Sequence, residues 1–232
     1  MGLRNTLRPA RRALNVLRGR DLWRRAQIQS PGISLGSGYG SWYLCPGALS
    51  TGGVAYCFGV GEEISFDLGL IERFKIQVHA FDPTPRSIQW VHSQSLPQEF
   101  VFHPYGVADY DGTSKFLPPA DASHVSHTLL PRATPWPAIE VPVHRLSTIM
   151  NLLGHGEIQL LKMDIEGAEY RVLADLVGCG IRVRQLLVEF HHRWPELGAG
   201  QTRKALRLLD SAGYRIFHVS PSGEEYSFLA LS

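Results

Sequence analysis

The sequence predicts an α/β domain with a mostly parallel sheet and helices on both of its faces. Strand-like segments alternate with helix-like segments from Val54 onward, and such alternation with short connections is typical of parallel sheets. The first segment ends in a Gly-x-Gly turn, Gly59 to Gly61, that leads into a helix. The last two strand-like segments are separated only by Pro-Ser-Gly-Glu-Glu, which predicts an antiparallel hairpin at the end of the chain.

The elements follow in order from this alternation. Strands are expected at residues 54–58, 77–82, 100–105, 158–163, 185–190, 214–219 and 226–231. Helices are expected at residues 62–74, 145–153, 167–177 and 202–212. The last helix has the clearest bounds, because Thr202 is a good N-terminal cap and Gly213 a good stop.

The segments before the first strand differ in character. Residues 1–30 are predicted to form a basic helical arm, and residues 31–53, rich in Gly, Ser and aromatic residues, an irregular connection at the domain boundary. The α/β domain is expected to occupy residues 54–232.

The arm is expected to be amphipathic. Residues 1–25 hold eight arginines and one acid, a net charge of +7, so the other 207 residues of the +2 chain sum to −5. One helix is expected between Pro9 and Gly19, and a second, shorter one from Asp21 through Ile28. Four leucines share one helical face, Leu3, Leu7, Leu14 and Leu17.

Three interpretations of the arm are open. In the first, the arm packs on the body as a lid or dimer arm. In the second, it is a peripheral anchor on anionic lipid, because basic amphipathic helices bind such surfaces. A transit peptide is also rich in arginine and poor in acids, but serine is absent from the first 29 residues.

Composition excludes several classes of protein. Apolar residues make up 44% of the 232-residue chain, too many for a disordered protein. No apolar run reaches the roughly 18 residues that span a bilayer. Three cysteines are few and odd in number, which argues against a disulfide framework and favours a reducing, cytoplasmic compartment.

A nucleoside site is predicted at the first two strand ends. Gly59 and Gly61 allow a close backbone approach at a helix start. Asp82 follows Gly59 by 23 residues, a spacing typical of an acid that binds ribose hydroxyls; the alternative is an Asx turn before Pro83. Ile64 stands where the dinucleotide fingerprint has a third glycine, which argues against NAD and FAD.

The fourth and fifth strands of the expected sheet end in titratable residues. Asp164, Glu166 and Glu169 follow one of them, and clustered carboxylates at a cleft suit a general base; helix capping is the alternative, favoured for Glu169. The next strand ends in Glu189, His191 and His192, where a histidine is also placed to take a proton.

Two further possibilities concern these histidines and acids. Asp164, Glu189 and His191 are of types that bind divalent metals, but no tight ligand spacing demands a metal, and none is expected. His124 and His127 either line an acceptor pocket or are ordinary loop histidines.

Five segments together resemble the FkbM-type family of S-adenosylmethionine-dependent methyltransferases. They are, in order, FGVGEEISFD, VHAFDPTP, GVADYDG, LLKMDIEGAE and LLVEFHH, and the likeness spans roughly residues 40–232. It implies a Rossmann-like, doubly wound, seven-stranded sheet whose C-terminal strand is antiparallel. It also implies methyl transfer, usually to an oxygen of a small molecule or sugar.

The resemblance also implies roles for individual residues. Gly59 and Gly61 would pass under the methionine part of the cofactor, and Asp82 would hold the ribose. Asp164 and Glu166 would lie beside the transferred methyl group. The residues that would border the adenine follow the third strand: Gly106, Val107, Ala108 and Asp109.

The sequence departs from the broader methyltransferase pattern at two positions. Cys57 stands where an acid often ends the first strand, and Glu63 where a further glycine often follows. We expect Glu62 or Glu63 to supply the missing carboxylate for the cofactor's amino group.

The expected function is therefore that of a cytoplasmic S-adenosylmethionine-dependent O-methyltransferase acting on a hydroxyl-bearing small molecule. A nucleic-acid methyltransferase that uses the arginine arm is an alternative, but the body is acidic and lacks the Asp/Asn-Pro-Pro-aromatic motif. A non-catalytic cofactor-binding module of the same fold is a second alternative. The oligomeric state stays open.

Overall fold

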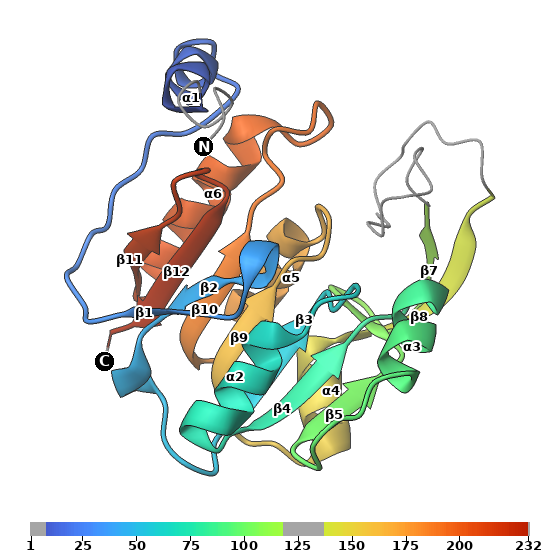
Figure 1. Cartoon of the computed structure of the whole chain (residues 1–232). Coiled ribbons are helices and arrows are strands. Elements are labelled where there is room, and N and C mark those ends of the chain that lie inside the picture. The colour runs from blue at the N-terminus through green and yellow to red at the C-terminus, as the bar shows by residue number, and fades with distance from the viewer. Residues whose placement is uncertain (1–7, 118–136, 232) are drawn as a thin grey trace.

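A seven-stranded sheet forms the centre of the computed structural model, which describes residues 8–117 and 137–231 (Figure 1). The strand order is β11-β12-β10-β9-β3-β4-β5. The strands are β3 (Val54–Phe58), β4 (Gln77–Phe81), β5 (Phe100–His103), β9 (Ile158–Met163), β10 (Val183–Glu189), β11 (Tyr214–Val219) and β12 (Glu225–Ala230). β12 runs antiparallel to both β10 and β11, and the other neighbours pair in parallel. The predicted sheet and its antiparallel C-terminal strand are confirmed.

Two apolar layers sandwich the sheet. One face is covered by α4 (Leu146–Leu153), α5 (Glu169–Gly178) and α6 (Gly198–Ser211). The other is covered by α2 (Ser65–Phe74), α3 (Pro85–His92) and the strand pair β1 (Ile33–Leu35) and β2 (Trp42–Leu44). β9 is buried along its whole length, as expected for a strand covered on both faces. The sequence pattern and the fold therefore agree at the centre.

Several elements differ from the sequence-based expectation. α3 was not predicted, because Pro83 before it and Pro85 at its first position resemble a turn. A three-stranded sheet was also missed; it consists of β6 (Gly106–Ala108), β7 (Gly112–Phe116) and β8 (Ile139–Arg145). Residues 31–53, expected to be irregular, contain β1 and β2, and Trp42 and Leu44 bury their side chains in the core.

The arm is helical at α1 (Arg8–Leu17), but the second helix expected from Asp21 is not formed. Asp21 is instead buried, and its carboxylate accepts hydrogen bonds from His192 at 3.0 Å and from Arg193 at 2.7 and 3.0 Å. Leu22 lies in the main apolar cluster. Long-range pairing has overridden the local capping signal, and the end of the arm belongs to the body.

α1 itself lies beyond the turn between β11 and β12 (Figure 1). The Arg12 guanidinium donates hydrogen bonds to the carbonyl oxygens of Leu22 and of Pro221, which belongs to that turn. Within the described residues, no helix has both the length and the apolar character needed to cross a membrane.

Candidate active site

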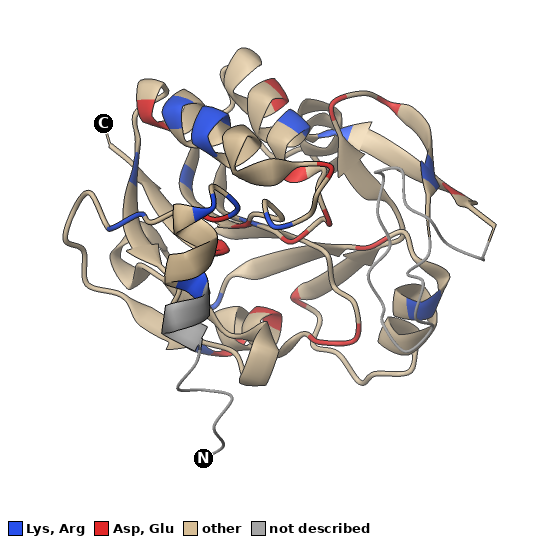
Figure 2. Cartoon of the chain, turned by 90° about the horizontal axis from the view of Figure 1, so that it is seen from above, with Lys and Arg blue, Asp and Glu red and all other residues tan. Residues whose placement is uncertain are grey.

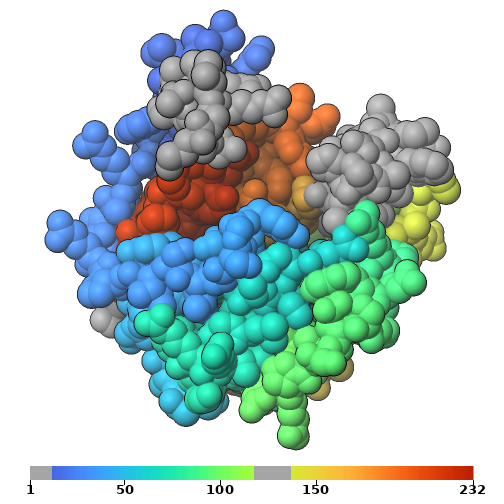
Figure 3. All heavy atoms as spheres, in the orientation of Figure 1, coloured from blue at the N-terminus to red at the C-terminus, as the bar shows by residue number. Residues whose placement is uncertain are grey.

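A cavity of about 430 Å³ opens at the carboxyl ends of β3, β4, β9 and β10, the edge at which open α/β sheets bind ligands. The space-filling view shows a hollow between the blue N-terminal and the orange C-terminal segments (Figure 3). The structure brings ten of the predicted residues to this cavity: Gly59, Gly61, Glu62, Asp82, Gly106, Val107, Asp164, Glu166, Glu189 and His191.

The glycine turn after β3 needs glycine for two different reasons. Gly59 has a φ of +83°, and a Cβ there would lie 1.9 Å from the carbonyl oxygen of Asp164. Gly61 has a φ of +57°, but a Cβ there would meet only open space. Close packing between β3 and β9 thus requires glycine at position 59, whereas at position 61 the backbone conformation alone favours it.

Asp82 pins this turn to the end of β4. One carboxylate oxygen accepts the backbone N–H groups of Val60 at 3.1 Å and Gly61 at 2.9 Å. The other accepts the backbone N–H of Thr84 at 2.9 Å and its hydroxyl at 2.6 Å. The Asx turn is therefore present, and all four lone-pair sites of the carboxylate have protein donors. Asp82 lines the cavity at 6% exposure, and its ribose contact stays a prediction.

The two glutamates after the turn have protein partners of their own. Glu62 lines the cavity, and its carboxylate pairs with the Arg86 guanidinium at 2.6 and 3.0 Å. Glu63 accepts the backbone N–H of Ser65 at 2.8 Å, at the start of α2. Either carboxylate would have to exchange a partner to bind the amino group of a cofactor.

The predicted adenine border is only partly at the cavity. Gly106 and Val107 line it. Ala108 does not; its side chain is buried with Val141 and Val143 in the small sheet. Its expected cofactor contact is therefore not supported by its position, because β6 alternates its side chains between two faces.

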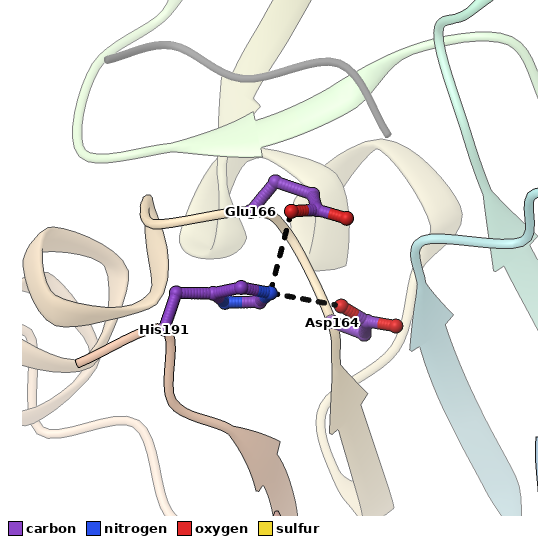
Figure 4. A group of neighbouring side chains, drawn as sticks. All are labelled: Asp164, Glu166 and His191. Carbon is purple, nitrogen blue, oxygen red and sulfur yellow. Dashed lines mark ion pairs between the residues drawn. The ribbon is translucent and has the colours of Figure 1, made fainter. Parts of the chain in front are cut away.

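Asp164, Glu166 and His191 converge in the wall of the cavity (Figure 4). The His191 Nε2 lies 3.6 Å from an Asp164 oxygen and 3.4 Å from a Glu166 oxygen. Asp164 follows β9, and His191 follows the neighbouring strand β10. Glu166 has a φ of +52°, a conformation unusual for a residue with a side chain. The predicted catalytic residues thus lie together.

Glu169 holds this group from behind. Its carboxylate is fully buried and lies 2.8 Å from His191 Nδ1. It also accepts the backbone N–H of His191 at 3.1 Å and that of Gly167 at 2.9 Å. Sequence reasoning assigned Glu169 to helix capping, because the spacing along one helix does not reveal a partner on the next strand.

The cluster is strongly electronegative. Burial alone would lower the pKa of His191, but the hydrogen bond and charge of Glu169, with Glu166 and Asp164, raise it to about 10. Burial, then the charge of Asp164, raises the pKa of Glu189 to about 9. Burial also raises the pKa of Asp164, against the opposing charges of Lys162 and His191. Such a site favours bound positive charge.

Acidic residues gather on loops near the centre of the molecule in the view from above (Figure 2). Of the described residues that line the cavity, six are Asp or Glu and none is Lys or Arg: Glu62, Asp82, Asp164, Glu166, Glu189 and Glu225. This lining fits the positively charged sulfonium of S-adenosylmethionine, and the open glycine turn leaves room beside it.

Two other polar residues behave differently from the expectation. His192 points away from the cavity and binds Asp21. Lys162, which was not singled out, is buried behind the glycine turn, and its ammonium donates to the Gly59 carbonyl at 3.0 Å. His124 and His127 lie outside the described residues.

Sequence similarity to known proteins indicates the family. The Methyltransferase FkbM domain model matches residues 57–216. Probable methyltransferase-like protein 24 of Homo sapiens is 26% identical over 174 residues, which cover 70% of this chain and 41% of the relative. The Rattus norvegicus protein of the same name is also 26% identical, over 70% of this chain and 42% of its own. The chain thus spans about two fifths of the length of these relatives.

Weaker likenesses occur among solved structures. Aeropyrum pernix fibrillarin in complex with natively bound S-adenosyl-L-methionine has a TM-score of 0.41 and 9% identity, over 92% of this chain and 86% of that one. A mutant of MtNAS has a TM-score of 0.39 and 10% identity, over 79% of this chain and 54% of that one.

The match to the family model covers more than half of the chain and includes the glycine turn, Asp82, Asp164 and His191. The chain therefore belongs to the FkbM-domain family of methyltransferases, and its cofactor is S-adenosylmethionine.

Proposed function

We propose that the protein transfers the methyl group of S-adenosylmethionine to a hydroxyl oxygen of a small molecule, a sugar being one such acceptor. The observation that carries this proposal is the convergence of Asp164, Glu166 and His191 in the wall of the cavity that also contains the glycine turn. A carboxylate–imidazole group suits an acceptor that must lose a proton.

The residues divide into two groups by position. Gly59 and Gly61 present backbone to the cofactor, and Asp82 holds their turn in place. S-adenosylmethionine supplies a methyl group already activated on sulfur. Asp164, at the end of β9, orients the acceptor hydroxyl for in-line attack. The new C–O bond forms as the S–C bond breaks, and S-adenosylhomocysteine leaves.

The hydroxyl proton passes to Asp164 in this scheme. His191 is poorly suited to receive it, because a pKa of about 10 leaves the imidazole protonated at neutral pH. Burial raises the pKa of the Asp164 carboxyl, which makes its ionised form a stronger base. His191 and Glu166 then act by positioning Asp164 and by balancing its charge.

Replacing Asp164 by Asn tests this proposal. The Asp164→Asn variant should bind S-adenosylmethionine with little change but transfer its labelled methyl group about 10²–10⁴ times more slowly to hydroxyl-bearing small molecules and sugars. Asp210→Asn is the matched control, because Asp210 pairs with Arg215 at 3.1 Å and does not line the cavity. Equal turnover in Asp164→Asn and wild type would remove the assignment. If nucleic acid were methylated and no small molecule were, the proposed acceptor would be wrong, and the protein would be a nucleic-acid methyltransferase.

A second proposal concerns the arm, which we infer to bind anionic membrane surfaces. Leu17 is 85% and Trp23 57% exposed, and the neighbouring exposed arginines are Arg18, Arg20, Arg24 and Arg25. Apolar and cationic side chains exposed together are typical of interfacial segments. Binding to anionic but not neutral vesicles, weakening with salt, would support it; equal binding by a Leu17→Ser, Trp23→Ser variant would count against it. A cytoplasmic location stays part of this proposal.

A further inference from the structure

We propose that Asp164, Glu166 and His191 bind one divalent transition-metal ion, and that this ion holds the acceptor oxygen. The inference rests on the proposed methyl transfer and specifies how the acceptor is bound. The three side chains offer one nitrogen and two carboxylate oxygens that all lie within 4.8 Å of one another.

The distances already approach those of a coordination shell. Ligand atoms about 2.1 Å from a shared ion lie about 3.0 Å apart at octahedral angles and about 3.4 Å apart at tetrahedral ones. The His191 Nε2 is 3.4 Å from Glu166 and 3.6 Å from Asp164. The two distances to the imidazole are therefore close to those that a shared ion requires.

The histidine is presented in the way that metal-binding histidines usually are. A ligating imidazole commonly donates its other ring N–H to a carboxylate, which fixes the tautomer and the ring orientation. Here the buried Glu169 carboxylate lies 2.8 Å from His191 Nδ1, and the His191 side chain is 9% exposed. This leaves Nε2 directed at the two carboxylates that face the cavity (Figure 4).

The ligand set indicates the class of ion. Imidazole favours Mn²⁺, Fe²⁺, Co²⁺ or Zn²⁺ over Ca²⁺ and Mg²⁺, which prefer oxygen alone. Three protein ligands leave positions open for water or for the acceptor hydroxyl. An ion held there would displace the proton from His191 Nε2 and would make Asp164 a ligand in place of its role as proton acceptor. It would lower the pKa of a bound hydroxyl, whose proton would pass to solvent, and the oxygen would form the new C–O bond as the S–C bond of the cofactor breaks.

Mn²⁺ binding to the full-length chain, freed of metal by a chelator, tests the site by calorimetry. Wild type should bind one equivalent, and His191→Ala and Glu166→Gln should each bind at least about tenfold more weakly. His144→Ala is the matched control: His144 also pairs with an acid, Asp111 at 3.4 Å, but belongs to no three-ligand group among the described residues. It should bind as wild type does.

The outcome is decisive in both directions. No saturable binding by wild type up to about 1 mM Mn²⁺, or equal loss in His144→Ala and His191→Ala, would overturn the site. S-adenosylmethionine binding by each variant shows that its pocket is folded. If methyl transfer persists unchanged in chelator, the metal inference fails and the proposed function stands; if no methyl transfer occurs with any ion, the proposed function fails.

Discussion

The Nδ1 of His191 lies 2.8 Å from the carboxylate of Glu169, and that carboxylate is fully buried. The same carboxylate binds the backbone N–H of Gly167, so one side chain ties the loop after β9 to the loop after β10. The relative placement of Asp164 and His191 therefore depends on a residue that faces the interior rather than the substrate.

The first prediction concerns this buried carboxylate. Glu169→Gln keeps the shape of the side chain but removes its charge, so the imidazole loses its strongest ionic partner and its fixed orientation. We expect the free energy of unfolding to fall by about 1–3 kcal/mol and methyl transfer to fall by about 10–100-fold, with S-adenosylmethionine affinity changed much less. Denaturant titration and a methyl-transfer assay measure both; turnover equal to wild type would show that Glu169 only stabilises the fold.

The two glycines of the turn should respond differently to substitution. In Gly59→Ala the new Cβ would overlap the Asp164 carbonyl, so we expect a stability loss of about 2 kcal/mol or more and loss of cofactor binding. Gly61→Asn should be tolerated within about 1 kcal/mol, because the space is open and Asn adopts a positive φ readily. Thermal denaturation compares them, and the reverse order of stability would contradict the packing argument.

Asp82 should matter to stability as well as to cofactor affinity. Asp82→Asn replaces one acceptor oxygen by an NH₂ group, which then faces either the N–H groups of Val60 and Gly61 or the N–H and hydroxyl of Thr84. We expect the free energy of unfolding to fall by about 1–3 kcal/mol. Chemical denaturation checks this, with Asp210→Asn as control. An unchanged stability combined with weakened cofactor binding would favour a purely ribose-binding role.

Truncations of the arm that keep or remove Asp21 should differ in stability. A chain that lacks residues 1–19 keeps Asp21 and Leu22 and should unfold at nearly the wild-type denaturant concentration. A chain that lacks residues 1–28 leaves His192 and Arg193 without their carboxylate and should be less stable by about 2–4 kcal/mol. Equal stability of the two truncations would show that Asp21 contributes nothing.

Stability should fall with acidity because of two stacked histidines. His79 Nδ1 lies 2.9 Å from His103 Nε2. Burial, with the charges of neighbouring histidines, lowers the pKa of each to about 4. The unfolded chain therefore binds protons below about pH 6.5 that the folded chain does not, and stability is lost as pH falls from about 6.5 to about 4.

The expected loss over that range is roughly 1–3 kcal/mol, beyond what other groups contribute. A His79→Phe, His103→Phe double variant keeps two aromatic rings but removes both titrating groups, so it should lose less stability than wild type between pH 7 and pH 4.5. Parallel pH dependence in the two proteins would contradict this cause.

The sequence predicted the parts of the structure that rest on local pattern. The buried run that forms β9, the glycine turn and the terminal hairpin have short-range signals, and the sheet places Asp164 beside His191 because their strands are neighbours. The roles of three residues were not predicted, because their hydrogen-bond partners are distant in sequence: Glu169, Lys162 and Asp21. The small sheet was not predicted either, because β7 and β8 pair although a long segment of chain separates them.

Calorimetric titration of the full-length protein with S-adenosylmethionine tests the central claim most directly, because every role assigned to the cavity depends on that cofactor. We predict one-site binding with a Kd below about 100 µM, which is abolished in Gly59→Ala and retained in Asp210→Asn. A folded wild-type protein that shows no binding up to about 1 mM cofactor, or variants that do not differ, would contradict the account.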